Sequence, residues 1–144
     1  MSAAKTKNPP LKLVIASDTF PPDINGAARF AERLASGLVR HGHDVHIIAP
    51  AYSSEHGTFI ETHDGAKMTV HRIKSYRVLQ HKTLRFVWPF TLRRKTDEIL
   101  DLTSPDAVHI QSHLIMGRYL IKSAKQRAIR LIATNHIMPE NLIR

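Results

Sequence analysis

The sequence predicts an α/β domain with a mainly parallel sheet and helices on both of its faces. Two observations carry this prediction. Residues 11–50 have the order strand, loop, helix, strand, which is a βαβ unit with parallel strands and a right-handed crossover. Strand-length apolar runs and helical patterns then alternate through the rest of the 144 residues. A chain of this length fits one domain and is long enough to bury a core.

The βαβ unit is predicted from short local signals. Residues 11–16 are an apolar run that is too short for a helix and rich in branched side chains, so they indicate a buried strand. The loop 17–25 contains two prolines together with turn-forming Asp and Asn, and the helix begins at Gly26. Gly42 directly follows the helix, where a left-handed cap residue is expected. The second strand covers residues 45–49 and ends at a proline.

The later elements alternate between strand and helix. Asp64-Gly65, between the β-prone runs 58–62 and 68–73, predicts an antiparallel hairpin, and the aperiodic residues 75–88 predict a mobile connection. The remaining predicted elements are a helix at 91–102 with Pro89 in its first turn, a strand at 107–110, a helix at 114–127, a strand at 129–134 and a helix beginning at Pro139. The expected inward-facing stripes are Phe30, Leu34 and Leu38 in the first helix, and Leu92, Ile99 and Leu102 in the second.

The ends and the composition limit the class of protein. Residues 1–10 are polar and lack the apolar core of a signal peptide, so we expect a disordered lead-in to a domain that spans residues 11–144. No apolar run approaches the ~20 residues of a transmembrane helix. The absence of cysteine excludes disulfides and thiolate metal sites and fits a cytosolic protein.

The positive charge is concentrated in one stretch. The chain has 21 Lys and Arg against 12 Asp and Glu, a net charge of +9, and residues 65–96 contain no acidic residue. Such an excess indicates a polyanionic partner: an anionic membrane surface, nucleic acid or a phosphorylated substrate. Aromatic side chains among the cations favour an interface over a merely solvated surface, either at lipid headgroups or stacked on bases. The predicted membrane-surface residues are Arg77, Lys82, Arg85, Trp88, Arg93, Arg94 and Lys95.

Three loops leave the carboxyl ends of predicted strands and should meet at one edge of the sheet. Their polar groups are the candidate site: Asp18, Asn25 and Gly26 from the first loop, Ser112 and His113 from the second, and Asn135 and His136 from the third. A glycine at the start of a helix lets a phosphate approach free N–H groups and the positive end of the helix dipole. The open alternatives are structural, hydrogen-bonded histidines and a plain turn glycine. No metal is predicted, because cysteine is absent and no carboxylate has a ligand's spacing.

Several motifs in this order resemble the retaining GT-B glycosyltransferases, glycosyltransferase family 4, and the phosphatidylinositol mannosyltransferases among them. The motifs are Asp18-Thr19-Phe20-Pro21-Pro22, Asn25-Gly26, Leu34-Ala35-Ser36-Gly37-Leu38, Gly42-His43-Asp44-Val45, the run from Pro105 to His113, and Thr134-Asn135-His136. The segment from Leu84 to Lys95 is similar to the basic membrane-docking helix of the mannosyltransferases. The resemblance covers nearly the whole chain from Leu11.

The resemblance implies a Rossmann-like domain, the N-terminal, acceptor-side half of a GT-B enzyme that transfers a hexose with retention. Asn25 and Gly26 would line the diphosphate of the nucleotide-sugar donor, where the family usually has two glycines. His136 would be the catalytic residue near the transferred sugar, and Asp18, Ser112, His113 and Asn135 would bind the acceptor. By the same resemblance the sugar is mannose, the acceptor is lipid-linked or membrane-proximal, and neither a cofactor nor a metal is needed.

The resemblance also implies a partner domain and a location. Residues 11–144 would be a truncated N-terminal domain that lacks the C-terminal nucleotide-sugar domain and is inactive alone. The enzyme would lie in the cytoplasm, peripheral to the inner face of the plasma membrane, with no nucleic acid as partner. Two alternatives stay open: a GT-B sugar-nucleotide epimerase, and a non-catalytic basic α/β module that binds nucleic acid. A flavodoxin-like or response-regulator domain is disfavoured, because only Asp18 supplies an acidic group after the first strand.

Overall fold

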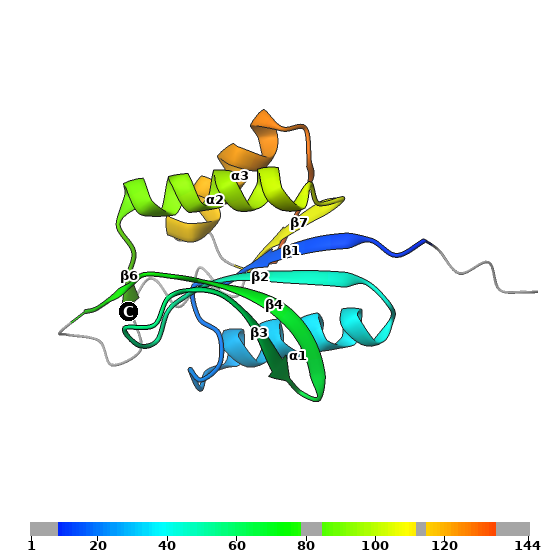
Figure 1. Ribbon diagram of the computed structural model, residues 1–144, viewed down its shortest axis with the longest axis horizontal. Coiled ribbons are helices and arrows are strands. Elements are labelled where there is room, and N and C mark those ends of the chain that lie inside the picture. The colour runs from blue at the N-terminus through cyan, green and yellow to red at the C-terminus, as the bar shows by residue number, and fades with distance from the viewer. Residues whose placement is uncertain (1–8, 79–84, 112–114, 135–144) are drawn as a thin grey trace, which may run out of the picture.

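The computed structural model describes residues 9–78, 85–111 and 115–134, and it contains a six-stranded sheet between two layers of helices (Figure 1). The strand order is β3-β4-β2-β1-β7-β8. The strands are β1 (Lys12–Ala16), β2 (Asp44–Pro50), β3 (Gly57–His63), β4 (Ala66–Ile73), β7 (Ala107–Ile110) and β8 (Arg130–Ala133). The helices are α1 (Gly26–Arg40), α2 (Pro89–Thr103) and α3 (Ile115–Gln126).

The sheet is parallel except at one edge. Strand β1 pairs in parallel with β2 and β7, β2 with β4, and β7 with β8, whereas β3 is antiparallel to β4. The predicted βαβ unit is therefore present as β1, α1 and β2 with parallel strands. The mainly parallel α/β class predicted from the sequence is confirmed.

Each face of the sheet packs against its own helical layer, because successive strand residues point to opposite faces. Ile15, Ile47 and Val70 pack beneath α1, whereas Val14 and Ile48 pack beneath α2 and α3. Figure 1 shows α1 on one side of the sheet and α2 with α3 on the other. The arrangement has two separate cores, each made of one sheet face and its helices.

The predicted inward stripes are wrong at two positions. Phe30 is 42% exposed and Leu102 is 80% exposed. The buried arc of α1 is formed by Ala28, Ala31 and Ala35, whose small side chains let the helix lie close to the sheet. In α2, Leu100 is buried and Leu102 projects to solvent, because at about 100° per residue Leu102 lies well outside the buried arc.

The hairpin turn predicted at Asp64-Gly65 and the helix cap predicted at Gly42 are both confirmed. The hairpin between β3 and β4 turns at Asp64 and Gly65, with φ values of 50° and 80°. Two successive positive φ angles are typical of the type I′ turn that matches the twist of a hairpin. Gly42, with a φ of 92°, follows α1 in the left-handed conformation.

The segment expected to be an irregular connection contains secondary structure at both of its ends. Strands β5 (Tyr76–Arg77) and β6 (Arg85–Phe86) form a short antiparallel pair, which precedes Pro89 in the first turn of α2. The Arg85 guanidinium ties this pair to the segments that follow β4 and β2, by donating to Ser75 Oγ at 2.7 Å and to the carbonyl of Tyr52 at 3.1 Å. These long-range contacts have no local sequence period, so the pattern of the sequence did not predict them.

Within the described part of the chain, no helix has both the length and the apolar character needed to cross a membrane. The predicted helix beginning at Pro139 and most of the predicted lead-in, residues 1–8, lie outside the described residues.

Candidate functional site

The carboxyl ends of three neighbouring strands lie at one edge of the sheet. Ala16 of β1 is in register with Ile110 of β7, which is in register with Ala133 of β8. The first residues beyond two of these strands extend the ladder: Gln111 N–H donates to the Ala16 carbonyl at 3.0 Å, and Thr134 N–H donates to the Ile110 carbonyl at 2.9 Å. Ala16, Gln111 and Thr134 therefore lie side by side at the carboxyl ends of three neighbouring strands, and we call this place the carboxyl edge.

The first loop delivers the N-terminus of α1 to the carboxyl edge. Asn25 caps the helix, because its Oδ1 accepts from Ala28 N–H at 2.8 Å and from Thr19 Oγ1 at 3.2 Å. Gly26 is exposed, and a Cβ built on it has no atom within 4 Å. The backbone at Gly26 is therefore open to an approaching ligand, while the side-chain oxygen of Asn25 holds the helix start in place. Asp18 is half-buried in the same loop.

The other predicted site residues lie mostly outside the described part of the chain. Ser112, His113, Asn135 and His136 are in the two undescribed stretches that follow Gln111 and Thr134. Their roles stay predictions. The described residues that flank them form a small polar group at the edge: His109 Nε2 lies 2.7 Å from Thr134 Oγ1 and 3.4 Å from Gln111 Nε2.

A buried arginine supports the first loop, and sequence reasoning missed this role. Arg72 lies in the acid-free basic stretch 65–96, yet it is only 4% exposed. Its Nη2 donates to the Pro21 carbonyl at 2.6 Å, and its Nε and Nη2 donate to the Glu61 carboxylate at 3.0 and 2.8 Å. Its Nη1 donates to the Pro50 carbonyl at 3.3 Å. One guanidinium thus joins the loop before Gly26 to the ends of β2 and the hairpin.

The charge of Arg72 is matched by Glu61. Burial alone would raise the pKa of the Glu61 carboxyl, but hydrogen bonds and charges from Arg72 and His63 hold that pKa below its ordinary value. The guanidinium also lies over the rings of Phe20 and Tyr52, at 5.3 and 5.0 Å from their centroids. A planar group with five donors suits this position because it bonds to the carboxylate in a bidentate manner and contacts both rings.

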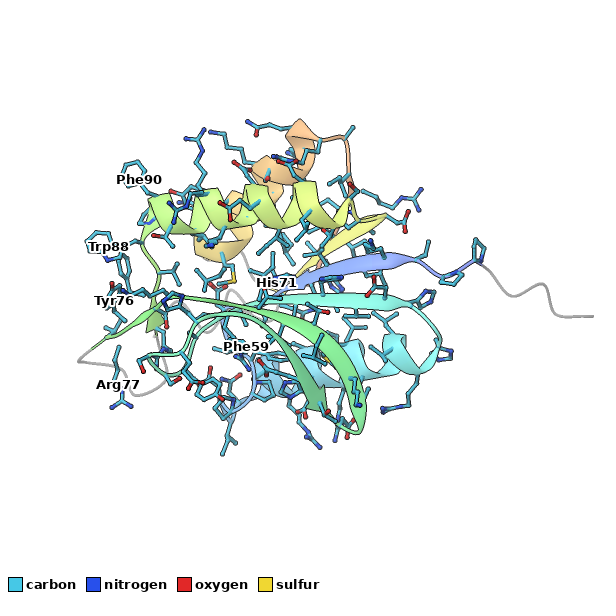
Figure 2. The ribbon with its side chains drawn as sticks, viewed as in Figure 1. Phe59, His71, Tyr76, Arg77, Trp88 and Phe90 are labelled. Atoms are coloured by element: carbon cyan, nitrogen blue, oxygen red, sulfur yellow. The ribbon has the colours of Figure 1, made fainter. Side chains whose placement is uncertain are left out.

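Some of the predicted membrane-surface residues are exposed, and others are only partly exposed. Trp88 and Phe90 are 56% and 87% exposed at the N-terminal end of α2, and Tyr76 is 44% exposed on β5. Figure 2 shows Tyr76, Arg77, Trp88 and Phe90 projecting on the same side of the molecule. We define the aromatic-basic surface as Tyr76, Arg77, Trp88, Phe90, Arg93 and Arg94, all of which are exposed. Arg85 and Lys95 are only partly exposed, and Lys82 lies outside the described residues.

Within the described ranges, no group of three or more His, Asp or Glu side chains is placed to hold a metal ion.

The fold and the carboxyl edge together define the class of the protein, a Rossmann-like half of a GT-B fold. The crystal structure of Acinetobacter baumannii MurG has this fold and matches 88% of this chain and 35% of its own, with a TM-score of 0.55 and 14% sequence identity. Residues 24–143 match Glycosyltransferase Family 4, and the chain belongs to that family. The fold class and the family expected from the motifs are therefore confirmed.

Curated relatives of the chain share one description. A "GDP-mannose-dependent alpha-mannosyltransferase" of Mycolicibacterium smegmatis is 27% identical over 123 residues, which is 85% of this chain and 32% of the relative. The protein of the same description from Mycobacterium tuberculosis is 27% identical over 124 residues, and that from Corynebacterium glutamicum is 25% identical over 127 residues. The chain thus spans about a third of the length of these relatives.

Proposed function

We propose that this chain is the acceptor-side part of a glycosyltransferase that moves a hexose from a nucleotide-sugar to a lipid-linked or membrane-proximal acceptor, with retention. Membership of Glycosyltransferase Family 4 supports transfer, and the relatives described as GDP-mannose-dependent support mannose as the sugar. The observation that carries the proposal is the carboxyl edge, where the ends of β1, β7 and β8 lie in register and the loop that leads from β1 ends at the capped start of α1.

The chemistry of transfer fits this edge. Cleavage of a glycosyl–phosphate bond develops negative charge on the leaving diphosphate. N–H groups fixed at a helix N-terminus stabilise that charge without reorganising during the reaction. In our proposal Gly26 lines the diphosphate, His136 lies at the transferred sugar, and His113 lies on the acceptor side. The 144 residues would form one wall of the cleft, so we expect binding but no turnover by this chain alone.

Substitution of Gly26 by alanine is expected to weaken the binding of GDP-mannose about tenfold, or ~1.4 kcal/mol, without loss of stability. The added methyl group meets no protein atom within 4 Å, so it projects only into space that the diphosphate would use. The measurement is an NMR titration of the isotope-labelled chain with GDP-mannose. The backbone amide chemical shifts near Gly26, Gln111 and Thr134 are expected to change.

Gly37 provides the matched control for this titration. It lies in the middle of α1, and a Cβ at this position also has no atom within 4 Å. The Gly37→Ala variant should bind like the wild type and be more stable by about 0.5–1 kcal/mol. Equal binding by wild type and Gly26→Ala, or shifts confined to another face, would contradict a donor site at the start of α1.

We further propose that the aromatic-basic surface docks the enzyme onto an anionic membrane. Lys and Arg near anionic headgroups contribute about 1 kcal/mol each, and exposed aromatic rings such as Trp88 and Phe90 can enter the interface. The exposed rings and cations of this surface lie together at one end of α2, which supports this part of the proposal.

The vesicle prediction uses the fluorescence of Trp88, the single tryptophan of the chain. Vesicles of phosphatidylglycerol should shift its emission to shorter wavelength, and neutral phosphatidylcholine or high salt should abolish the shift. Phe90→Ser should weaken binding several-fold, whereas Ile60→Ser, a substitution at a 69% exposed side chain on β3, should not. Tighter binding to single-stranded oligonucleotides than to anionic vesicles would favour the nucleic-acid module instead.

A further inference from the structure

A cavity lies on the face of the sheet opposite α1, between α2 and the hairpin of β3 and β4. Its volume is about 350 Å³, and its described lining includes no residue of the loop 17–25. Figure 2 shows His71 between α2 and the sheet, in the interior of the molecule. We call this space the α2–β4 cavity. The side chains that matter for its chemistry are Thr58, His71, Lys74, Arg94, Lys95 and Glu98.

The strand wall of the cavity carries a chain of polar contacts that crosses three strands. Thr58 Oγ1 on β3 lies 2.9 Å from His71 Nδ1 on β4, and His71 Nε2 lies 3.0 Å from His46 Nδ1 on β2. His46 Nε2 is 3.4 Å from Asp44 Oδ1. The two imidazole rings are stacked at 11°, with centroids 5.3 Å apart.

One placement of protons satisfies all of these contacts when both rings are neutral. The Asp44 carboxylate, 3.4 Å away, favours a proton on His46 Nε2, and in that tautomer His46 Nδ1 accepts from His71 Nε2–H. His71 Nδ1 then accepts from the Thr58 hydroxyl. Burial, followed by the charge of His46, lowers the pKa of His71 from 6.5 to about 4, which is consistent with a neutral ring at pH 7.

This proton placement gives the Thr58 hydroxyl a fixed role toward the cavity. In this tautomer its proton is directed to His71 Nδ1, so the lone pairs of its oxygen are available to accept hydrogen bonds from a ligand. Thr58 is exposed, so a ligand can reach that oxygen. The cavity therefore offers acceptors, Thr58 and the Glu98 carboxylate, to a ligand that carries hydroxyl groups.

The helix wall adds an excess of cations and an apolar surface. Glu98 is shared by Lys95, at 3.4 Å, and Arg94, at 4.0 Å, so one carboxylate faces two cations. Lys74 contributes a third cation at the end of β4, and Glu98 is the one carboxylate among the described lining residues. Ile99 and the 80% exposed Leu102 provide the apolar part.

We propose that the α2–β4 cavity binds a phosphorylated sugar. Its hydroxyl groups donate to Thr58 and Glu98, its C–H face packs on Leu102, and its phosphate pairs with the cations at the rim. This site is separate from the carboxyl edge, so it can exist whether or not the proposed transfer reaction is correct.

The test is a titration of the isotope-labelled chain with mannose 6-phosphate, with mannose and inorganic phosphate as parallel probes. We expect saturable amide shifts at Thr58, His71 and residues 94–99 with mannose 6-phosphate, and at least tenfold weaker binding of either separate component. Inorganic phosphate bound as tightly as the sugar phosphate would overturn the proposal, because the site would then recognise an anion only. Shifts confined to the surroundings of Gly26, or no shift at the cavity, would also overturn it.

Variants of the two walls separate recognition from folding. Thr58→Val should weaken binding of mannose 6-phosphate about tenfold, and Thr58→Ser should restore it. Thr62→Val is the matched control, because Thr62 lies on the same face of β3 but outside the described lining of the cavity. Lys95→Gln leaves the contacts of His71 intact and should also weaken binding, so a low melting temperature of Thr58→Val alone does not decide the outcome. Unchanged binding in Lys95→Gln and Thr58→Val together would refute the proposal.

Discussion

Arg72→Met is expected to lower the free energy of unfolding by about 3–5 kcal/mol. The substitution keeps a similar volume but leaves the partly buried Glu61 carboxylate without its bidentate partner. It also removes the donors that reach the carbonyls of Pro21 and Pro50. Unfolding in urea, followed by circular dichroism, measures the loss.

Two further variants isolate the cause of the loss. Arg29→Met removes an arginine that is 56% exposed and pairs with Glu32 along α1, and it should change stability by less than ~0.5 kcal/mol. Combining Arg72→Met with Glu61→Leu should recover part of the loss, because no unpaired charge is then left behind. A cost below ~1 kcal/mol for Arg72→Met would show that this arginine does not hold the edge together.

Arg72→Met should also increase local opening of the first loop. Hydrogen exchange at the amides from Thr19 to Ala28 should become faster in Arg72→Met, since the Pro21 carbonyl loses the 2.6 Å bond that ties this loop to β4. Because α1 begins at the end of this loop, the ion pair of Arg72 and Glu61 helps to hold the start of α1 in the geometry of the proposed donor site.

The second large effect expected is a loss of stability in mild acid, caused by His71. In the unfolded chain His71 takes up a proton near pH 6.5. In the folded chain the pKa of His71 is lowered to about 4, first by burial and second by the charge of His46. Between these two values the unfolded state binds more protons, so stability falls as the pH decreases. From pH 7 to pH 5 this group alone should remove about 2 kcal/mol of the free energy of unfolding.

His71→Gln is the variant that tests this assignment. It is expected to reduce the difference in stability between pH 7 and pH 5 by most of that amount, because glutamine does not titrate. The other charged or titratable groups near His71 are His46 on β2 and, around the same cavity, His56, Arg72, Lys74, Arg94, Lys95 and Glu98. Groups that do not contact His71 contribute equally in both proteins, so their contributions cancel in the comparison. His46 lies 3.0 Å from His71 and is coupled to it, so the remaining difference belongs to this pair. An unchanged pH dependence in His71→Gln would assign the acid sensitivity to another group.

The sequence by itself determined the order and type of the helices and of the strands of the main sheet, but not the short pair β5 and β6. The two-residue period of strands, the 3.6-residue period of helices and the turn chemistry of Asp64-Gly65 and Gly42 are local properties. The described helices, the strands of the main sheet and both turns are present where they were predicted, although the inward stripes were wrong at Phe30 and Leu102. Loops at the carboxyl ends of parallel strands share one edge as a rule of topology, and the pairing of β1, β7 and β8 follows that rule. The family was likewise readable from motif order.

Only the tertiary structure decided which of the similar side chains are buried. Arg72 stands in a run of exposed cations, and its burial depends on Glu61 across the hairpin and on Pro21, which is 51 residues away in the chain. The chain of contacts from Thr58 through His71 to His46 requires three strands to be in register. Ala28, Ala31 and Ala35 face the sheet, whereas Phe30 is 42% exposed. Burial, charge pairing and proton placement result from contacts between segments that are distant in sequence, so no local pattern specifies them.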